Sequence, residues 1–287
     1  VDDCENGIGW VKVDIMAPCV VKADCLTLGK GVLICQTVED AVEAIKTIME
    51  DKKFGSSGNN IVIEEFLTGP EVSVLSFTDG KTVKPMVSSK DHKRAYDNDE
   101  GLNTGGMGTI SPNPYYTDEL AKQCMEEIFI PTVNAMKAEG RPFKGCLYFG
   151  LMMTPKGPKV IEYNARFGDP EAQVVLPRLK TDLVDICDAV IDERLDEINI
   201  EWSDEPTACV VMASGGYPES YKKGIEMFGL DDKGQVEGAT VYHAGTKYEN
   251  GKFYTNGGRV LGVTASGKTL DDALNNAYNA VKKISFE

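Results

Sequence analysis

The stretch KVIEYNARFGDPE, residues 159–171, places oxygen ligands and a cation within a few positions of one another. On a β-strand, Val160, Glu162 and Asn164 would share one face, so that a carboxylate and an amide oxygen point the same way. Such oxygen ligands suit Mg²⁺ bridging nucleotide phosphates. Arg166 follows directly, and its planar guanidinium can bind a carboxylate or a phosphate. The pattern predicts a cation site beside an anion site; a surface strand with an arginine–carboxylate ion pair is the ordinary alternative.

A second candidate site begins at Lys22, which we place at the end of a strand. The turn that follows, ADCLTLGKG at residues 23–31, contains Gly29 and Gly31, which allow the backbone to approach an anion closely. It is not a P-loop, because the residue after Lys30 is glycine rather than serine or threonine. We predict a phosphate-holding loop, and a plain structural turn is the alternative that the local pattern leaves open.

The stretch EEFLTGPE, residues 64–71, is extended and partly apolar. Backbone of this kind can hydrogen-bond an adenine edge, and Glu71 at its end can hold ribose hydroxyls. Two solvated glutamates near a strand end would look the same.

A polar stretch from residue 88 to 114 predicts a loop much longer than usual connections. Within it, DHKR supplies the donors His92, Lys93 and Arg94, and NTGGMG (103–108) supplies a hydroxyl and backbone amides. Together they favour anion binding, although a basic run is usually a solvated surface. We interpret His243 as structural.

Composition narrows the class of protein. The chain has 287 residues and a formal net charge of −15, which makes nucleic acid a poor partner. Its eight cysteines occur singly without a CxxC pair, as expected for reduced thiols of a cytoplasmic protein, and two histidines leave few zinc ligands. No apolar run approaches the roughly 20 residues that span a bilayer, so we expect no membrane partner. The chain begins without Met, and we expect it to be a fragment.

The elements that must position these residues follow from periodicity. A helix is predicted over residues 37–51 behind a Thr37 cap, another over 117–140 with a bend at Pro131, and another over about 181–195. Hairpins are predicted at Asp79-Gly80, between 146 and 164, and at Asn250-Gly251, and a last helix begins at Thr269. We expect three domains: a lid at 1–67, a body with the magnesium and substrate site at 68–199, and a C-terminal domain at 200–287.

Taken together, these segments resemble the phosphoribosylamine–glycine ligases of the ATP-grasp superfamily. The resemblance covers about residues 20–286 in family order and is carried by VVKADCLTLGKGV, IVIEEFLTGPEVS, DHKRAYDNDEGLNTGGMGTISP, GPKVIEYNARFGDPEAQVVLPRLKTDL and NGGRVLGVTA. It implies an α+β architecture, an ATP-grasp fold made of a small lid subdomain and a mixed-sheet body, followed by a small C-terminal α/β domain.

The resemblance also implies an activity: ATP-dependent joining of glycine to 5-phosphoribosylamine through glycyl phosphate, in de novo purine biosynthesis, with Mg²⁺ (or Mn²⁺). Lys22 and Arg166 would be catalytic, and Glu162 and Asn164 would bind the metal. The nucleotide would be bound by Lys22, Lys30, Glu64, Glu65, Phe66, Leu67 and Glu71. The substrates would be bound by His92, Lys93, Arg94, Asn103, Thr104, Gly105, Gly106 and Asp169. Glu171 lies nearby without an assigned role.

Two departures from the family pattern leave alternatives open. Cys25 stands where the family has glycine, and Thr27 and Leu28 stand where it has alanines. We expect the chain to lack the family's N-terminal domain, and the parent polypeptide is a candidate for fusion to other purine-pathway domains. The alternatives are another ATP-grasp carboxylate–amine ligase, or a non-catalytic ATP-binding fragment.

Overall fold

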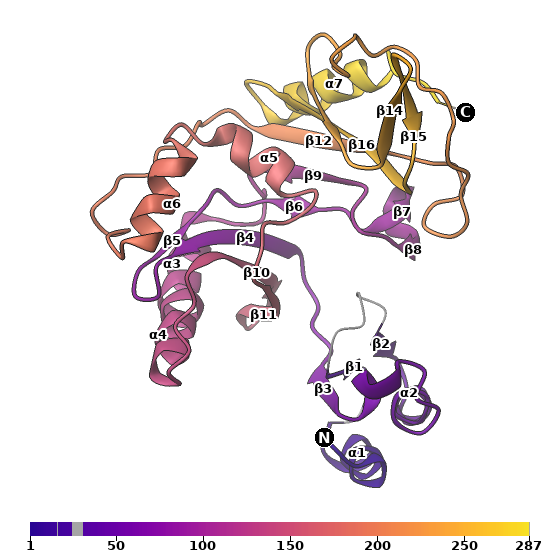
Figure 1. Cartoon of the computed structure of the whole chain (residues 1–287). Helices are drawn as coiled ribbons and strands as arrows, with labels where there is room; N and C mark the ends of the chain where they lie inside the picture. Colours follow the sequence, from indigo (N-terminus) through magenta and orange to yellow (C-terminus); the bar gives the residue numbers. More distant parts are fainter. Residues whose placement is uncertain (16, 25–30, 287) are drawn as a thin grey trace. The chain divides into compact units, whose positions relative to one another are not determined.

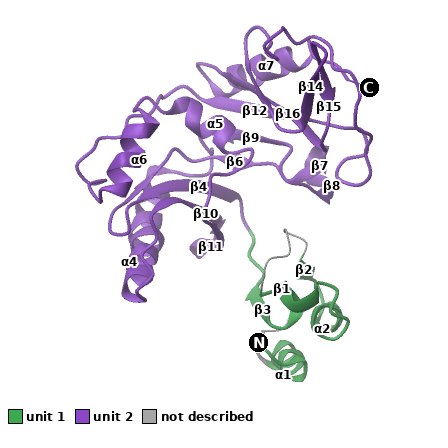
Figure 2. Ribbon diagram, viewed as in Figure 1, with its two compact units in different colours: residues 1–68 green, residues 69–287 purple. Residues whose placement is uncertain are grey.

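The structure is a computed structural model that describes residues 1–15, 17–24 and 31–286. It divides into two compact units, Val1–Thr68 and Gly69–Glu287 (Figure 2). None of the described helices is long and apolar enough to cross a membrane.

The first unit is a three-stranded antiparallel sheet in the order β2-β1-β3, with helices on one face (Figure 1). Its strands are β1 (Cys19–Ala23), β2 (Val32–Cys35) and β3 (Ile61–Glu65), and its helices are α1 (Cys4–Trp10) and α2 (Val38–Met49). Thr37 and Asp40 form the capping box of α2, which confirms the predicted helix start. Ile45 and Ile48 of α2 are fully buried against the sheet, so the opposite sheet face is left open.

The second unit contains a four-stranded antiparallel sheet in the order β11-β10-β4-β5. Its strands are β4 (Glu71–Thr78), β5 (Val83–Pro85), β10 (Gly145–Thr154) and β11 (Gly157–Asn164). The predicted hairpins at Asp79-Gly80 and between 146 and 164 are both confirmed. One face packs on the helical segment from Asp118 to Ala138, where Phe129 and Phe149 are fully buried.

That helical segment comprises α3 (Asp118–Cys124), a π-helical turn (Met125–Phe129) and α4 (Ile130–Ala138). The irregular turn lies directly before Pro131, which has no N–H to donate to the preceding turn. The expected departure from a regular helix therefore lies just ahead of the proline.

A five-stranded sheet in the order β13-β16-β12-β9-β6 completes the second unit. It joins β6 (Lys90–Asp91) and β9 (Gly108–Ser111) to β12 (Thr207–Ala213), β13 (Thr240–His243) and β16 (Arg259–Ser266). The remaining elements are the ribbons β7–β8 (Arg94–Tyr96, Glu100–Asn103) and β14–β15 (Thr246–Glu249, Lys252–Thr255), and the helices α5 (Ala172–Val175), α6 (Leu183–Ile191) and α7 (Leu270–Val281). The hairpin at Asn250-Gly251 and the Thr269 cap of α7 are confirmed.

The expectation of a plain loop over residues 88–114 is wrong. The segment holds β6, β7, β8 and β9, and β9 pairs with β12. These strands are two to four residues long. β9 is buried throughout although its sequence is Gly-Thr-Ile-Ser. The sequence therefore lacks the alternation of apolar residues that would predict them. The boundary expected at residue 200 stays a prediction, and residues on its two sides share this sheet.

Candidate functional site

The face of the four-stranded sheet opposite α3 and α4 carries polar side chains from three strands. Gly150 of β10 lies opposite Ser73 of β4 and Glu162 of β11, and Tyr148 lies opposite Asn164. Because residues that pair directly lie on the same face, these side chains converge. An added Cβ on Gly150 would lie 3.0 Å from Glu162 Cγ, so the glycine leaves room for the glutamate.

A β-bulge at Ile161 determines which β11 residues belong to this face. Val160 pairs with Leu151 whereas Glu162 pairs with Gly150, so the extra residue reverses the alternation. Val160 and Tyr163 consequently face the hydrophobic core. Glu162 and Asn164 share a face as predicted, but the expectation that Val160 shares it is wrong.

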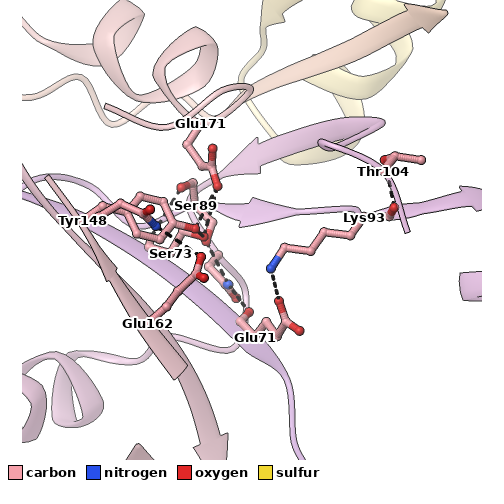
Figure 3. Close-up of polar contacts among 10 residues, drawn as sticks. Glu71, Ser73, Ser89, Lys93, Thr104, Tyr148, Glu162 and Glu171 are labelled. Carbon is pink, nitrogen blue, oxygen red and sulfur yellow. Dashed lines mark hydrogen bonds and ion pairs between the residues drawn. The ribbon is translucent and has the colours of Figure 1, made fainter. Parts of the chain in front are cut away.

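The base of the site is a buried hydrogen-bonded group of three residues, Ser73, Tyr148 and Glu171 (Figure 3). The Tyr148 hydroxyl donates to Glu171 Oε1 at 2.9 Å and lies 2.7 Å from Ser73 Oγ. Burial and the neighbouring Glu171 carboxylate raise the pKa of Tyr148 above its usual range. The hydroxyl therefore keeps its proton and gives the 4%-exposed Glu171 a donor.

Lys93 pairs with Glu71, with Nζ 3.1 Å from Oε2 (Figure 3). Burial opposes the lysine charge, but Glu71, Asp91 and Glu162 outweigh it and raise the pKa of Lys93. The ammonium is thus held among three carboxyl groups, which is a suitable position for a cation that contacts ligand phosphates or carboxylates.

Asp91 was missed as a candidate, although it begins the DHKR motif. Burial, with Glu171 nearby, raises the pKa of its carboxyl to about 7. Its Oδ1 atom is buried and has no hydrogen-bond partner among the described residues. Neither feature has a signal in the local sequence, because burial and the proximity of Glu171 are properties of the folded chain.

The motifs DHKR and NTGGMG lie side by side. The Met107 N–H donates to the His92 carbonyl at 2.7 Å, and the Thr104 N–H and hydroxyl both donate to the Lys93 carbonyl, at 2.7 and 2.8 Å. Thr104 Oγ1 also accepts from Gly106 N–H at 3.0 Å. Burial and Lys90 lower the pKa of His92, so this imidazole is neutral near pH 7.

The other predicted substrate residues include Arg94, Asn103 and Asp169, which lie at the edge of the site. Arg94 is exposed and donates to the Gly101 carbonyl at 2.8 Å, and it pairs with Asn103 across β7–β8. Asp169 accepts from Arg259 and from Gln173 at 3.0 and 2.8 Å. Like Asp91, Arg259 was missed as a candidate, although it belongs to the motif NGGRVLGVTA.

Glu162, Asn164 and Arg166, for which a cation site and an anion site were predicted, lie close to one another. Asn164 Nδ2 lies 3.2 Å from Glu162 Oε1, and Arg166 Nη2 lies 3.5 Å from Asn164 Oδ1. The donor set consists of carboxylate and amide oxygens, and Glu162 is exposed, so these residues fit Mg²⁺. The described part of the chain contains no cluster of three or more His, Cys, Asp or Glu that could hold a metal. A cation here would therefore need further oxygens from a ligand.

In the first unit, Lys22 and Glu64 form an ion pair on the open sheet face, at 2.6 Å. Strand register places Val32 and Val62 on either side of Lys22, and Ile34 lies near on the same face. These three apolar side chains are 39–53% exposed. An apolar surface beside a cation suits a flat ring that carries phosphates.

After Glu65, Phe66 and Leu67 continue β3 as irregular, half-buried backbone, which suits the expected adenine contact. Lys30, Cys25 and the rest of residues 25–30 lie outside the described residues.

Comparisons with known proteins give consistent matches. The family model "Phosphoribosylglycinamide synthetase, ATP-grasp (A) domain" matches residues 2–172, and the corresponding C domain matches 207–287. The phosphoribosylamine–glycine ligase of Clostridium acetobutylicum is 50% identical over 270 residues, 94% of this chain and 64% of that protein. The chain thus spans slightly less than two thirds of the length of such relatives.

Solved structures agree on the architecture. The phosphoribosylamine–glycine ligase of Thermotoga maritima matches with a TM-score of 0.87 and 32% identity, covering 100% of this chain and 71% of that one. The biotin carboxylase domain of Hydrogenobacter thermophilus 2-oxoglutarate carboxylase, solved with MgADP and bicarbonate, matches with a TM-score of 0.73 and 15% identity, covering 99% of this chain and 60% of that one. The second likeness concerns the fold alone, and both support the predicted α+β ATP-grasp architecture.

Proposed function

Because the chain belongs to the phosphoribosylglycinamide synthetase family, we propose that the complete protein is a phosphoribosylamine–glycine ligase. It would join glycine to 5-phosphoribosylamine with ATP, giving glycinamide ribonucleotide, ADP and phosphate in purine biosynthesis. The curated relatives with this name support the assignment at about 50% identity. In this proposal, residues 1–67 are the lid, 68–199 the body and 200–287 the C-terminal domain.

The proposed nucleotide contacts lie between residues 22 and 71. Lys22 and Lys30 would contact phosphates, Glu64, Glu65, Phe66 and Leu67 the adenine, and Glu71 the ribose. The open apolar face around Lys22 supports this assignment, since exposed valine and isoleucine on a sheet face need a ligand or partner to cover them. Glu162 and Asn164 would hold Mg²⁺, which would neutralise developing phosphate charge.

The proposed chemistry has two steps. A glycine carboxylate oxygen attacks the γ-phosphorus of ATP, the bond to the ADP oxygen breaks, and glycyl phosphate forms. The ribosylamine nitrogen then attacks the glycyl carbonyl carbon, loses a proton, and expels phosphate. Arg166 and Lys93 lie where they can bind anionic groups, and no side-chain nucleophile is needed. Positioning and charge neutralisation account for catalysis.

One observation carries this proposal most directly: the strand register brings Glu162 and Asn164 onto the same sheet face as Glu71, which is paired with Lys93. The proposed oxygen ligands for a cation are therefore near the lysine of the DHKR motif, although these residues come from separate segments. His92, Arg94, Asn103, Thr104, Gly105, Gly106 and Asp169 would complete the substrate contacts.

The test is ADP release by the complete gene product with MgATP, with glycine and freshly generated 5-phosphoribosylamine added separately and together. We expect release only when both are present. Release with neither or with one alone, or with another carboxylate or amine in place of these substrates, would refute this ligase assignment.

A paired variant tests the proposed nucleotide contact. Lys22→Ala should weaken MgATP binding about ten- to a hundredfold, because it removes a charged contact to phosphate. Lys46→Ala is the matched control, since Lys46 is an exposed lysine of α2 in the same unit. Equal affinities of the two variants would contradict the role of Lys22.

A further inference from the structure

Two residues from the C-terminal part of the chain hold Gly105 of the NTGGMG loop from both sides. Arg259 Nη1, at the start of β16, donates to the Gly105 carbonyl at 2.8 Å. The Gly105 N–H donates to the Tyr217 hydroxyl oxygen at 3.0 Å. The peptide groups on either side of Gly105 are therefore fixed by side chains more than a hundred positions away in sequence.

The same guanidinium also binds the turn that contains Asp169. Arg259 Nη1 donates to the Asp169 carbonyl at 2.9 Å, and Nη2 donates to Asp169 Oδ2 at 3.0 Å. One planar fork thus connects the NTGGMG segment with the turn at Asp169. A lysine could not reproduce these contacts, because it offers a point charge in place of a planar set of donors.

The packing around Arg259 is close. A Cβ atom added to Gly105 would lie 2.9 Å from the Arg259 guanidinium carbon, so a side chain at this position would displace the guanidinium. A Cβ added to Gly258 would lie 2.3 Å from the Tyr217 ring. The glycines of NTGGMG and NGGRVLGVTA therefore let the arginine and the tyrosine approach the loop backbone.

We propose that Arg259, assisted by Tyr217, is a positioning residue for the ligase reaction. It sets the NTGGMG loop and the Asp169 turn in one fixed arrangement, and it acts through these segments without touching substrate. The inference rests on the proposed function, because the two segments are the proposed substrate contacts. It gives the C-terminal part of the chain a role in forming the acceptor site.

The first experiment measures local order without substrate. Hydrogen exchange of backbone amides is compared among the wild type, Arg259→Gln and Lys252→Gln. Lys252 forms a cation–carboxylate pair with Glu226 at 2.7 Å on β15 and is the matched control. We expect faster exchange confined to residues 103–108 and 167–171 in Arg259→Gln only. Unchanged exchange, or acceleration spread over the whole second unit, would overturn the inference.

The second experiment measures kinetics of the complete gene product. Arg259→Gln should raise KM for glycine or 5-phosphoribosylamine at least about tenfold, since small misplacements of binding groups are costly, while the Kd for MgATP stays within twofold. Arg259→Lys should keep most of this defect. Full rescue by lysine, or an equal loss of nucleotide affinity, would show a charge effect or a general structural role.

The two proposals fail in different ways. A wild type that releases no ADP with both substrates would refute the ligase, and the exchange comparison would still decide whether Arg259 orders the two segments.

Discussion

The open sheet face of the first unit and the polar face of the second differ in the burial and bonding of their side chains. On the first, Lys22 and Glu64 lie among Val32, Ile34 and Val62, and these apolar side chains are exposed. On the second, Ser73, Tyr148 and Glu171 are buried and bonded to one another. The apolar side chains of the first face are therefore accessible to a ligand, whereas the polar side chains of the second are held by hydrogen bonds within the fold.

This difference predicts which substitutions change ligand affinity alone and which also change the free energy of unfolding. Substituting an exposed residue on the open face should change affinity and leave the free energy of unfolding nearly unchanged. Substituting a buried polar residue of the second face should change both, since a lost partner leaves its neighbour without a hydrogen bond.

The largest effect is expected from Glu162→Ala, an exposed residue on the second face. Turnover should fall about a hundred- to a thousandfold, because an oxygen ligand that helps to neutralise phosphate charge is lost. Stability should change by less than about 0.5 kcal/mol, as for other exposed positions. Turnover assays and denaturant unfolding measure the two quantities, with Glu249→Ala on β14 as the control. Unchanged turnover would contradict the proposal that Glu162 binds the metal.

The Thr37 cap of α2 and the turns at Asp79-Gly80 and Asn250-Gly251 were predictable because their signals lie within four residues. The bulge at Ile161 and the pairing of β9 with β12 were not, since both depend on partners far away in sequence. The same holds for the site: Glu162 and Lys93 were visible as motif members, whereas the roles of Tyr148 and Asp91 follow from burial and from their proximity to Glu171 in the fold.

Asp91→Asn is expected to have an intermediate effect, which is a change in stability that depends on pH. The pKa of Asp91 is about 7 in the folded protein, above its ordinary value of 3.8, so its protonated form is favoured by folding. That contribution to stability is complete below about pH 4 and is lost as pH rises through 7. The stability of Asp91→Asn relative to wild type should therefore increase by about 1–2 kcal/mol between pH 5.5 and 8.

Denaturant unfolding at the two pH values checks this prediction. Asp97→Asn is the control, because Asp97 lies exposed in the same segment. A pH-independent difference between Asp91→Asn and wild type would contradict the buried, protonated carboxyl.

The smallest effect is expected from Ile34→Thr on the open face, which keeps a β-branched residue but removes apolar surface. MgATP affinity should fall about three- to fivefold, as expected for losing part of an isoleucine contact, with little change in stability. Ile130→Thr, at an exposed position of α4, should leave affinity unchanged. Isothermal titration with both variants makes the comparison, and equal affinities would remove the apolar face from the nucleotide site.

We propose that the complete protein activates glycine as an acyl phosphate. This proposal is tested by supplying glycine labelled with ¹⁸O in its carboxylate, together with MgATP and 5-phosphoribosylamine, and measuring the mass of the released phosphate. We expect each released phosphate to carry one oxygen from glycine, because the attacking oxygen leaves with phosphorus when the amine displaces it. Unlabelled phosphate accompanying formation of glycinamide ribonucleotide would contradict the acyl phosphate route.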